Sequence, residues 1–158
     1  MTASMAPKTV RASRISIAQL MQPEHANILG NVHGGWILKL VDDVGALACM
    51  RHSQRRVVTV AIDSMVFRHP IKVGDLVLLT AEITGVGKTS MEVEIQVQAE
   101  NPTSGETKHT NTAYAVYVAL DDAGKPVPVP PLQAETEDEQ RRQAAARERQ
   151  ARRLQERQ

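Results

Sequence analysis

The chain has few aromatic residues, a single cysteine and almost no net charge. Only 3% of its 158 residues are aromatic, so its core must be built mainly from the Val, Ile, Leu and Ala that dominate its 42% of hydrophobic residues. The single cysteine, Cys49, excludes an internal disulfide bond and a cysteine-based zinc site. With 19 basic and 18 acidic residues, no overall field attracts nucleic acid or a membrane surface. The totals favour one globular domain with a tail.

Long apolar runs are also missing. No N-terminal stretch resembles a signal peptide, and no uncharged run approaches the ~20 residues of a membrane span. The most apolar stretch runs from Gly34 to Met50, and Lys39, Asp42 and Asp43 interrupt it. We therefore expect a soluble, cytoplasmic protein that does not associate with membranes.

The histidines do not have the spacing of a metal site or of a catalytic triad. No pair is arranged as in HExxH, and no GxSxG sequence accompanies them. The five are His25, His33, His52, His69 and His109. The sequence predicts no bound metal.

One carboxylate stands out in the most apolar segment. From Gly34 to about Ser53, apolar residues recur at helical spacing, which predicts a buried helix. Lys39 and Asp43 lie four residues apart and can pair on a solvated edge. Asp42 instead aligns with small or apolar residues, so we expect it in or beside the core. It is either a structural acid, partly exposed or bound to a backbone N–H or an arginine, or a functional one.

The rest of the chain has the pattern of an antiparallel sheet. Segment 89–100 alternates apolar and polar residues, which predicts one buried face and one solvated face. The other expected strands are 14–21, 56–68, 76–84 and 106–120. A helix that is apolar almost all round needs a sheet curled about it, so the fold class is α+β.

The two ends differ from this central part. Residues 1–13 are polar and without pattern, which predicts a flexible N-terminus. The central domain spans 14–132, and its proline-rich end, 121–131, should run extended over the surface. Residues 133–158 are rich in Arg, Glu and Gln, and we expect a charged helical tail that is solvated or frayed because it lacks an apolar face.

Several blocks together resemble a known family. They are N-x-x-G-N-V-H-G-G-x-I-L-K-x-x-D from Asn27 to Asp42, then RH (51–52), VVT (57–59), F-x-x-P-I-x-x-G-D (67–75), G-K-T-S-M-E (87–92) and GKPVPVPPL (124–132). In this order they are similar to the hotdog-fold acyl-CoA thioesterases of the YciA and brain acyl-CoA hydrolase type. The resemblance covers residues 14–132 and leaves out both ends.

The resemblance implies a hotdog fold, in which about five antiparallel strands wrap around a central helix. It also implies a homodimer with shared active sites, assembled as a trimer of dimers (a homohexamer), and hydrolysis of acyl-CoA to a free acid and CoA. Coenzyme A is then part of the substrate, and no separate cofactor is expected. By position in the motif, Asn27 and Asp42 correspond to the family's catalytic asparagine and aspartate, which meet across the dimer interface.

The glycines at the helix start suggest how a thioester is activated. Gly34 and Gly35 open the helix, where unpaired N–H groups and the positive end of the dipole lie. We expect the Gly35 amide to polarise the carbonyl and Asp42 to act as general base or as nucleophile, although a tight loop-to-helix turn also explains the glycines. Asp42 lies about 10 Å along the helix from Gly35, so one site cannot easily use both from a single chain.

Binding of the CoA portion is expected at a glycine-containing turn and at nearby cations. Gly87, Lys88, Thr89 and Ser90 supply backbone donors, hydroxyls and a cation, although such a sequence is also typical of a plain hairpin turn. Gly34, Thr59 and Arg68 complete the predicted CoA-binding set. Arg51, Arg55 and Arg56 could also reach the 3′-phosphate.

Three other functions remain open. A hotdog hydratase or dehydratase would use a histidine paired with a carboxylate, and no histidine occupies the expected place before a Pro-Gly element. A sensor that binds acyl-CoA without turnover would lack the asparagine or the aspartate, and both are present. Nucleic-acid binding through the arginine-rich tail is weakly supported, because acidic residues offset the charge and no aromatic residues are interleaved.

Overall fold

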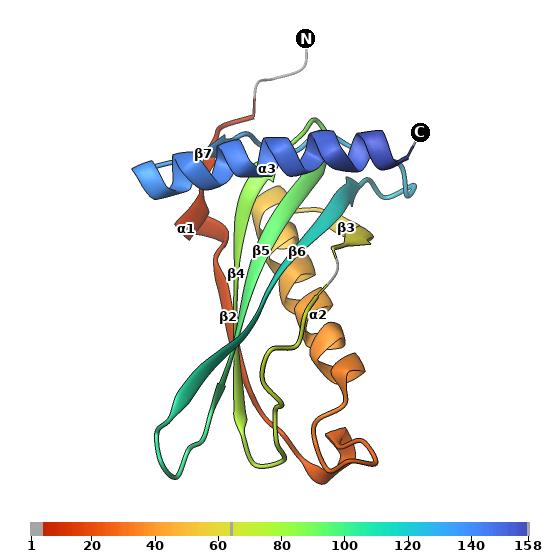
Figure 1. The fold of residues 1–158 in the computed structure, drawn as a ribbon. Helices are drawn as coiled ribbons and strands as arrows, with labels where there is room; N and C mark the ends of the chain where they lie inside the picture. Colours follow the sequence, from red (N-terminus) through yellow and green to blue (C-terminus); the bar gives the residue numbers. More distant parts are fainter. Residues whose placement is uncertain (1–4, 64, 158) are drawn as a thin grey trace.

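A curved antiparallel sheet wraps around one long helix. The computed structural model describes residues 5–63 and 65–157, and its five-stranded sheet has the strand order β2-β4-β5-β6-β3. Figure 1 shows helix α2 in the curl of the sheet and helix α3 across the strand ends. The elements are β1 (Lys8–Thr9), α1 (Val10–Ser13), β2 (Ile15–Leu20), the 3-10 helix η1 (Pro23–His25), α2 (Gly34–Ser53), β3 (Arg56–Ile62), β4 (Leu76–Val86), β5 (Ser90–Glu100), β6 (Thr107–Leu120), β7 (Leu132–Gln133) and α3 (Glu137–Glu156). The predicted α+β class and hotdog arrangement are confirmed.

Helix α2 has defined signals at both ends. His33 is its N-cap, and Gln54 ends it in the left-handed conformation with φ 57°. Between these residues, Ile37, Val41 and Val44 are buried against the sheet. The exposed Lys39–Asp43 pair, with 2.8 Å between Nζ and Oδ2, is the solvated edge that the sequence predicts.

Strand β5 alternates as predicted, but its outward face is not solvated throughout. Met91, Val93 and Ile95 face α2 and are fully buried. Glu92, predicted to face solvent, is only 6% exposed because α3 covers it. The alternation identified the two faces correctly, but a helix distant in the sequence decides which positions water reaches.

Strand β3 is shorter than the predicted 56–68. It pairs with β6 from Arg56 to Ile62 and has a register shift between Thr59 and Ala61. Beyond Ile62 the chain leaves the sheet and passes the start of α2, where the Phe67 ring would lie 3.4 Å from a Cβ atom on Gly34. The expected strand is therefore wrong after Ile62, where the ladder with β6 ends: Asp63 and Val66 each keep a hydrogen bond to β6, and Phe67 packs on α2.

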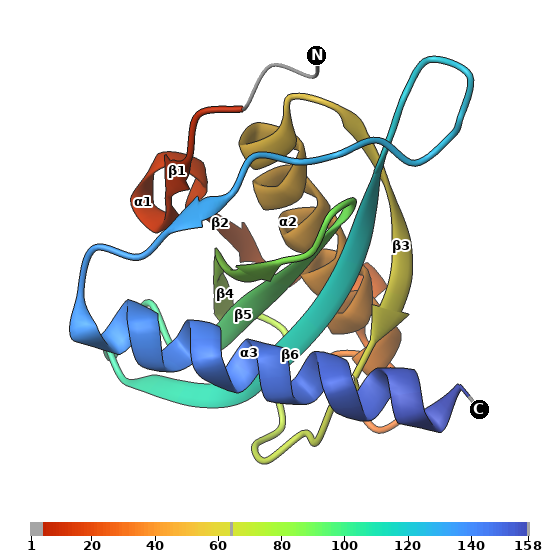
Figure 2. The ribbon, with the colours of Figure 1, turned by 90° about the horizontal axis from the view of Figure 1, so that it is seen from above.

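The C-terminal segment forms the expected helix, but one face of this helix packs on the sheet instead of standing free in solvent. Thr136 and Glu139 form a capping box at its start. Seen from above in Figure 2, α3 crosses the outer side of the sheet while α2 lies on the inner side. The two surfaces approach closely, since a Cβ atom on Gly85 of β4 would lie 2.9 Å from the Ala146 Cβ. The prediction of an unpacked tail fails because arginines take the place of an apolar face.

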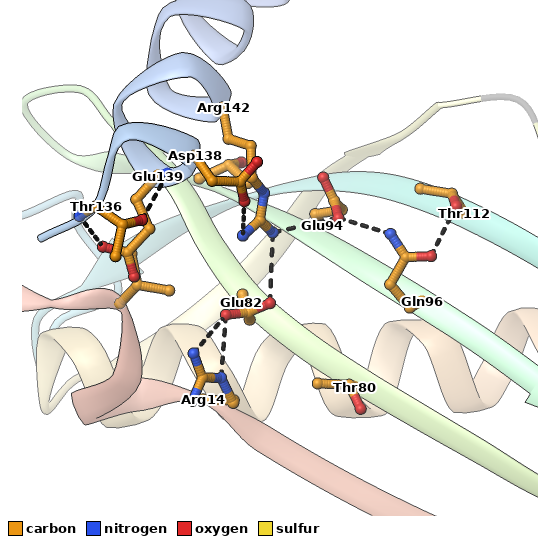
Figure 3. A network of polar contacts seen from close by, with 12 residues as sticks. Arg14, Thr80, Glu82, Glu94, Gln96, Thr112, Thr136, Asp138, Glu139 and Arg142 are labelled. Atoms are coloured by element: carbon orange, nitrogen blue, oxygen red, sulfur yellow. Dashed lines mark hydrogen bonds and ion pairs between the residues drawn. The ribbon is translucent and has the colours of Figure 1, made fainter. Parts of the chain in front are cut away.

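Those arginines meet carboxylates on the outer side of the sheet. Figure 3 shows the first cluster, in which Arg142 of α3 reaches Glu82 of β4 (3.5 Å) and Glu94 of β5 (3.2 Å), while Arg14 binds Glu82 from the other side (2.8 Å). A second cluster lies further along α3 and joins Arg149 and Arg153 to Glu92. Long arginine stems with paired heads can thus dock a helix that has almost no apolar stripe.

The N-terminal segment is also more ordered than predicted. β1 pairs in parallel with β7, and the Val10 side chain is buried in the core. The prediction of a flexible terminus is therefore wrong for residues 8–13, while residues 1–4 lie outside the described part. No helix within residues 5–63 and 65–157 is long and apolar enough to cross a membrane.

Candidate active site

Asp42 is held by two hydroxyl groups from neighbouring strands. Thr59 of β3 donates a hydrogen bond to its Oδ1 (2.8 Å), and Tyr117 of β6 lies 3.0 Å from the same oxygen and from the Asp42 carbonyl. Thr59 and Tyr117 are directly opposite each other in the β3–β6 ladder, so the sheet register presents both to α2. Among the described residues Asp42 forms no ion pair, and its Oδ2 has no hydrogen-bond partner. The carboxylate is partly exposed, with one oxygen fixed and the other available.

Tyr117 is a site residue that the sequence did not reveal. It is fully buried, and burial first and the charge of Asp42 second raise its pKa, so its hydroxyl remains a donor. A side chain at Gly45 would lie 2.6 Å from this hydroxyl, so the helix needs glycine there. The β3–β6 pairing is the signal that could have identified Tyr117, but pattern alone does not give the register.

Asn27 lies in a tight loop at the other end of the α2 region. Its Oδ1 accepts from the N–H groups of Leu29 (2.9 Å) and Asn31 (3.2 Å), and the loop turns at Gly30 with φ 84°. These bonds fix the amide plane and leave the Nδ2 group as a donor, since no described residue accepts from it. The side chains of Ile28 and Leu29 beside it are exposed.

The amide predicted to polarise a carbonyl is occupied in this structure. The Gly35 N–H donates to His33 Nδ1 (2.9 Å), which is the N-cap bond of α2. The Gly34 N–H has no partner among the described residues. His33 therefore caps the helix, and a ligand that reaches the Gly35 N–H would have to replace this bond.

Two cavities meet at the start of α2. The first, about 320 Å³, is lined by Gly34, Gly35, Leu38, Ile62, Asp63, Met65 and Phe67. The second, about 340 Å³, is lined by Asn27, Asn31, Val32, Gly34, Ile37, Phe67, His69, Pro70 and Ile71. They share Gly34 and Phe67 as lining residues, so the two cavities adjoin at the start of α2; together they are called the cleft, which Asn27 and the helix glycines border.

Within one chain, the predicted catalytic residues form two groups. Asn27 and Gly35 border the cleft, whereas Asp42 lines neither of its two cavities and lies with Thr59 two turns further along α2. This separation agrees with the distance of about 10 Å worked out from the helix rise. The geometry of a single chain does not bring all three together.

The predicted CoA-binding residues are also divided. Gly87 to Ser90 form the tight turn between β4 and β5, closed by a bond from the Gly87 N–H to the Ser90 carbonyl (2.8 Å). The turn is held by Val129, whose N–H donates to the Lys88 carbonyl (2.9 Å), and by Ala119, whose N–H donates to the Thr89 carbonyl (3.0 Å). Arg68 is exposed and lines neither cavity, although its sequence neighbours Phe67 and His69 line the second one. Thr59 hydrogen-bonds to Asp42, so Thr59 lies with the candidate catalytic carboxylate and not with the other predicted CoA-binding residues.

A protein-family model and curated relatives match most of the central part of the chain. The family model described as "Thioesterase superfamily" matches residues 29–106. A rat cytosolic acyl coenzyme A thioester hydrolase is 36% identical over 138 residues, which are 86% of this chain and 36% of that protein, so the chain spans about a third of this relative. An uncharacterised acyl-CoA thioester hydrolase of Bacillus subtilis is 38% identical over 132 residues, 84% of this chain and 73% of the relative.

Solved structures agree over nearly the whole chain. An apo-hexameric acyl-CoA thioesterase matches with a TM-score of 0.92 and 36% identity, covering 96% of this chain and 97% of the other. An acyl-CoA hydrolase of Staphylococcus aureus, solved with butyryl coenzyme A, coenzyme A and coenzyme A disulfide, matches with a TM-score of 0.88 and 31% identity, covering 95% and 92%. That hydrolase has also been solved with an aspartate, an asparagine or a threonine replaced by alanine. The hotdog architecture, the family match and these relatives together show that the chain belongs to the thioesterase superfamily.

Proposed function

We propose that the protein hydrolyses acyl-CoA thioesters to a free carboxylic acid and CoA. The observation that carries this proposal is the Asp42 carboxylate, which is fixed through one oxygen by Thr59 and Tyr117 and paired with no cation among the described residues. Such a group can accept a proton from water through its second oxygen. The relatives named as acyl-CoA thioester hydrolases support the substrate class.

The alanine variants of the Staphylococcus aureus hydrolase support the choice of residues. Its replaced asparagine, aspartate and threonine follow one another at intervals of 15 and 17 residues. Asn27, Asp42 and Thr59 follow one another at the same intervals. We therefore assign these three residues to the site and add Tyr117 from the geometry.

In the proposed reaction, Asp42 Oδ2 takes a proton from water while the water oxygen bonds to the thioester carbon. Amides at the start of α2 stabilise the charge on the carbonyl oxygen, a contribution of about 3–4 kcal/mol for one donor. The C–S bond then breaks, and the leaving CoA sulfur takes up the proton. Asn27 orients the water or the carbonyl through its free Nδ2 group. Direct attack by Asp42 is the second route, in which water hydrolyses the resulting anhydride.

We further propose that each site is shared between two protomers. Strand β3 is an edge of the sheet, and its Val58 and Val60 side chains are exposed, as are Leu38 and Leu47 on α2. Pairing of two β3 edges would continue the sheet and cover these apolar groups. It would also bring Asp42 of one protomer near Asn27 and the amides of the other. A trimer of such dimers is the proposed assembly, by analogy with the hexameric thioesterase. The cytoplasmic location stays a prediction.

The test is release of free thiol from acyl-CoA substrates of increasing chain length. Asp42→Asn should lower turnover by at least about 100-fold, the usual contribution of a general base, while the far-UV spectrum stays unchanged. Asp43→Asn is the matched control, because Asp43 is adjacent and exposed, and among the described residues its side chain binds only Lys39. Near-normal turnover by Asp42→Asn would exclude the catalytic role, and CoA binding without thiol release by the wild type would indicate a sensor.

A further inference from the structure

Asp63 connects the edge strand to the cleft at the start of α2. It directly follows β3, and its N–H donates to the Tyr114 carbonyl (2.9 Å). With Ile62, Met65 and Phe67 it forms the wall that faces Gly34, Gly35 and Leu38. This wall is mostly apolar and therefore suits an acyl chain. The position of Asp63 thus influences the shape of the cleft.

Arg153 of α3 holds this carboxylate in a fixed orientation. Its Nε lies 3.2 Å from Asp63 Oδ1, and its Nη2 lies 2.8 Å from Oδ2, which is the two-point geometry of a strong arginine–carboxylate pair. The same Nη2 contacts Glu92 at 2.9 Å. The Arg153 side chain is only 11% exposed, whereas that of Asp63 is 36% exposed, so the pair is buried on the arginine side and reaches solvent on the carboxylate side.

Other arginines besides Arg153 also dock α3 on the sheet. Arg149, about one turn earlier, binds Glu92 through two bonds of 3.0 and 2.7 Å and lies 3.8 Å above the Tyr114 ring. Arg142 anchors the first half of the helix to Glu82 and Glu94 (Figure 3). Among the arginines of α3 within the described residues, only Arg153 contacts Asp63.

We propose that Arg153 is a positioning residue that sets acyl-chain preference. Through its two-point hold on Asp63, it fixes the wall of Ile62, Met65 and Phe67 against the start of α2. The C-terminal helix thereby adjusts the substrate cleft from the opposite side of the sheet. This inference rests on the hydrolase function proposed above.

The experiment compares kcat/KM for decanoyl-CoA and acetyl-CoA in Arg153→Gln and Asp63→Asn. Each variant should change the ratio of the two values by about tenfold, which is the low end of the discrimination that one methylene group of a substrate gives in a hydrophobic pocket. The double variant should change the ratio no further, because both substitutions remove the same interaction. If Arg153→Gln does not fold, Asp63→Asn alone gives the answer.

Two variants on the same helix separate positioning from docking. Arg149→Gln and Arg142→Gln each remove one arginine that docks α3 but does not touch Asp63, and both should keep the ratio within about twofold of the wild type. An equal change of ratio in Arg149→Gln would overturn the proposal, as would an unchanged ratio in both Arg153→Gln and Asp63→Asn. A wild type that releases no thiol would refute the hydrolase function and this inference together, whereas normal wild-type turnover with an unchanged ratio would refute this inference alone.

Discussion

Replacing Glu92 by glutamine tests how helix α3 is attached to the sheet. Glu92 is 6% exposed and accepts bonds from Arg149 and Arg153, whose side chains are 16% and 11% exposed. Its Oε1 also accepts from the Thr84 hydroxyl at 2.5 Å. The substitution keeps the volume of the side chain, removes its charge and turns one of its two acceptor oxygens into an N–H donor.

The expected effect is large because both arginines stay close to the sheet. Removing one partner of a buried ion pair destabilises a protein by about 3–5 kcal/mol, since the remaining charge is buried without compensation. Arg153 keeps Asp63 as a partner and Arg149 can turn partly toward solvent, so we expect the lower end, about 3 kcal/mol. The exposed pair Lys39–Asp43, with side chains 61% and 50% exposed, should contribute no more than about 0.5 kcal/mol.

Urea unfolding followed by circular dichroism gives the free energy of unfolding of Glu92→Gln, of Asp43→Asn and of the wild type. Glu92→Gln should lower the urea midpoint strongly, whereas Asp43→Asn should hardly move it. A reduced slope of free energy against urea would show that α3 has already detached before global unfolding. Equal, small effects of the two substitutions would refute the reasoning that a buried charge network docks this helix.

Two further predictions concern helix α2. Gly45→Ala places a Cβ atom 2.6 Å from the Tyr117 hydroxyl, so overpacking of about 1–3 kcal/mol should exceed the gain in helix propensity of about 1 kcal/mol. Urea unfolding should show a lower free energy of unfolding, and adding Tyr117→Phe should partly restore it. A Gly45→Ala protein that is more stable than the wild type would contradict this. Burial lowers the pKa of His52 despite its bond to the Pro130 carbonyl (2.8 Å), so as the pH falls below about 6.5 the unfolded chain binds a proton that the folded chain does not. The free energy of unfolding should therefore fall from about pH 7 to pH 5, less steeply in His52→Gln; equal slopes would contradict the assignment.

The predictions that held depend on local patterns. The inward residues of β5, the apolar spacing of α2 and the Lys39–Asp43 pair are each read from residues within one element, and these were found as expected. The strands and the central helix were predictable because their periods of 2 and 3.6 residues need no knowledge of distant partners. The motif around Asn27 and Asp42 likewise lies in one continuous stretch of sequence.

The predictions that failed depend on partners far away in the chain. Ending β3 at Ile62 and burying Glu92 require knowledge of which segments pack beside them. Composition described the C-terminal helix as solvated, because a count of charges does not show that each buried arginine faces a carboxylate. The occupied Gly35 amide was missed because the sequence does not show the orientation of the His33 ring.

The sequence by itself determined the α+β class and the central helix, which follow from periodicity. The hotdog arrangement and the candidates Asn27 and Asp42 came from the resemblance of a continuous motif to a known family. Only the tertiary structure decided that Tyr117, 75 residues after Asp42, donates to the same carboxylate as Thr59. It also decided that Arg153, 90 residues after Asp63, holds the wall of the cleft. Strand register and helix docking bring such pairs together, and both arise from packing that no local stretch of sequence encodes.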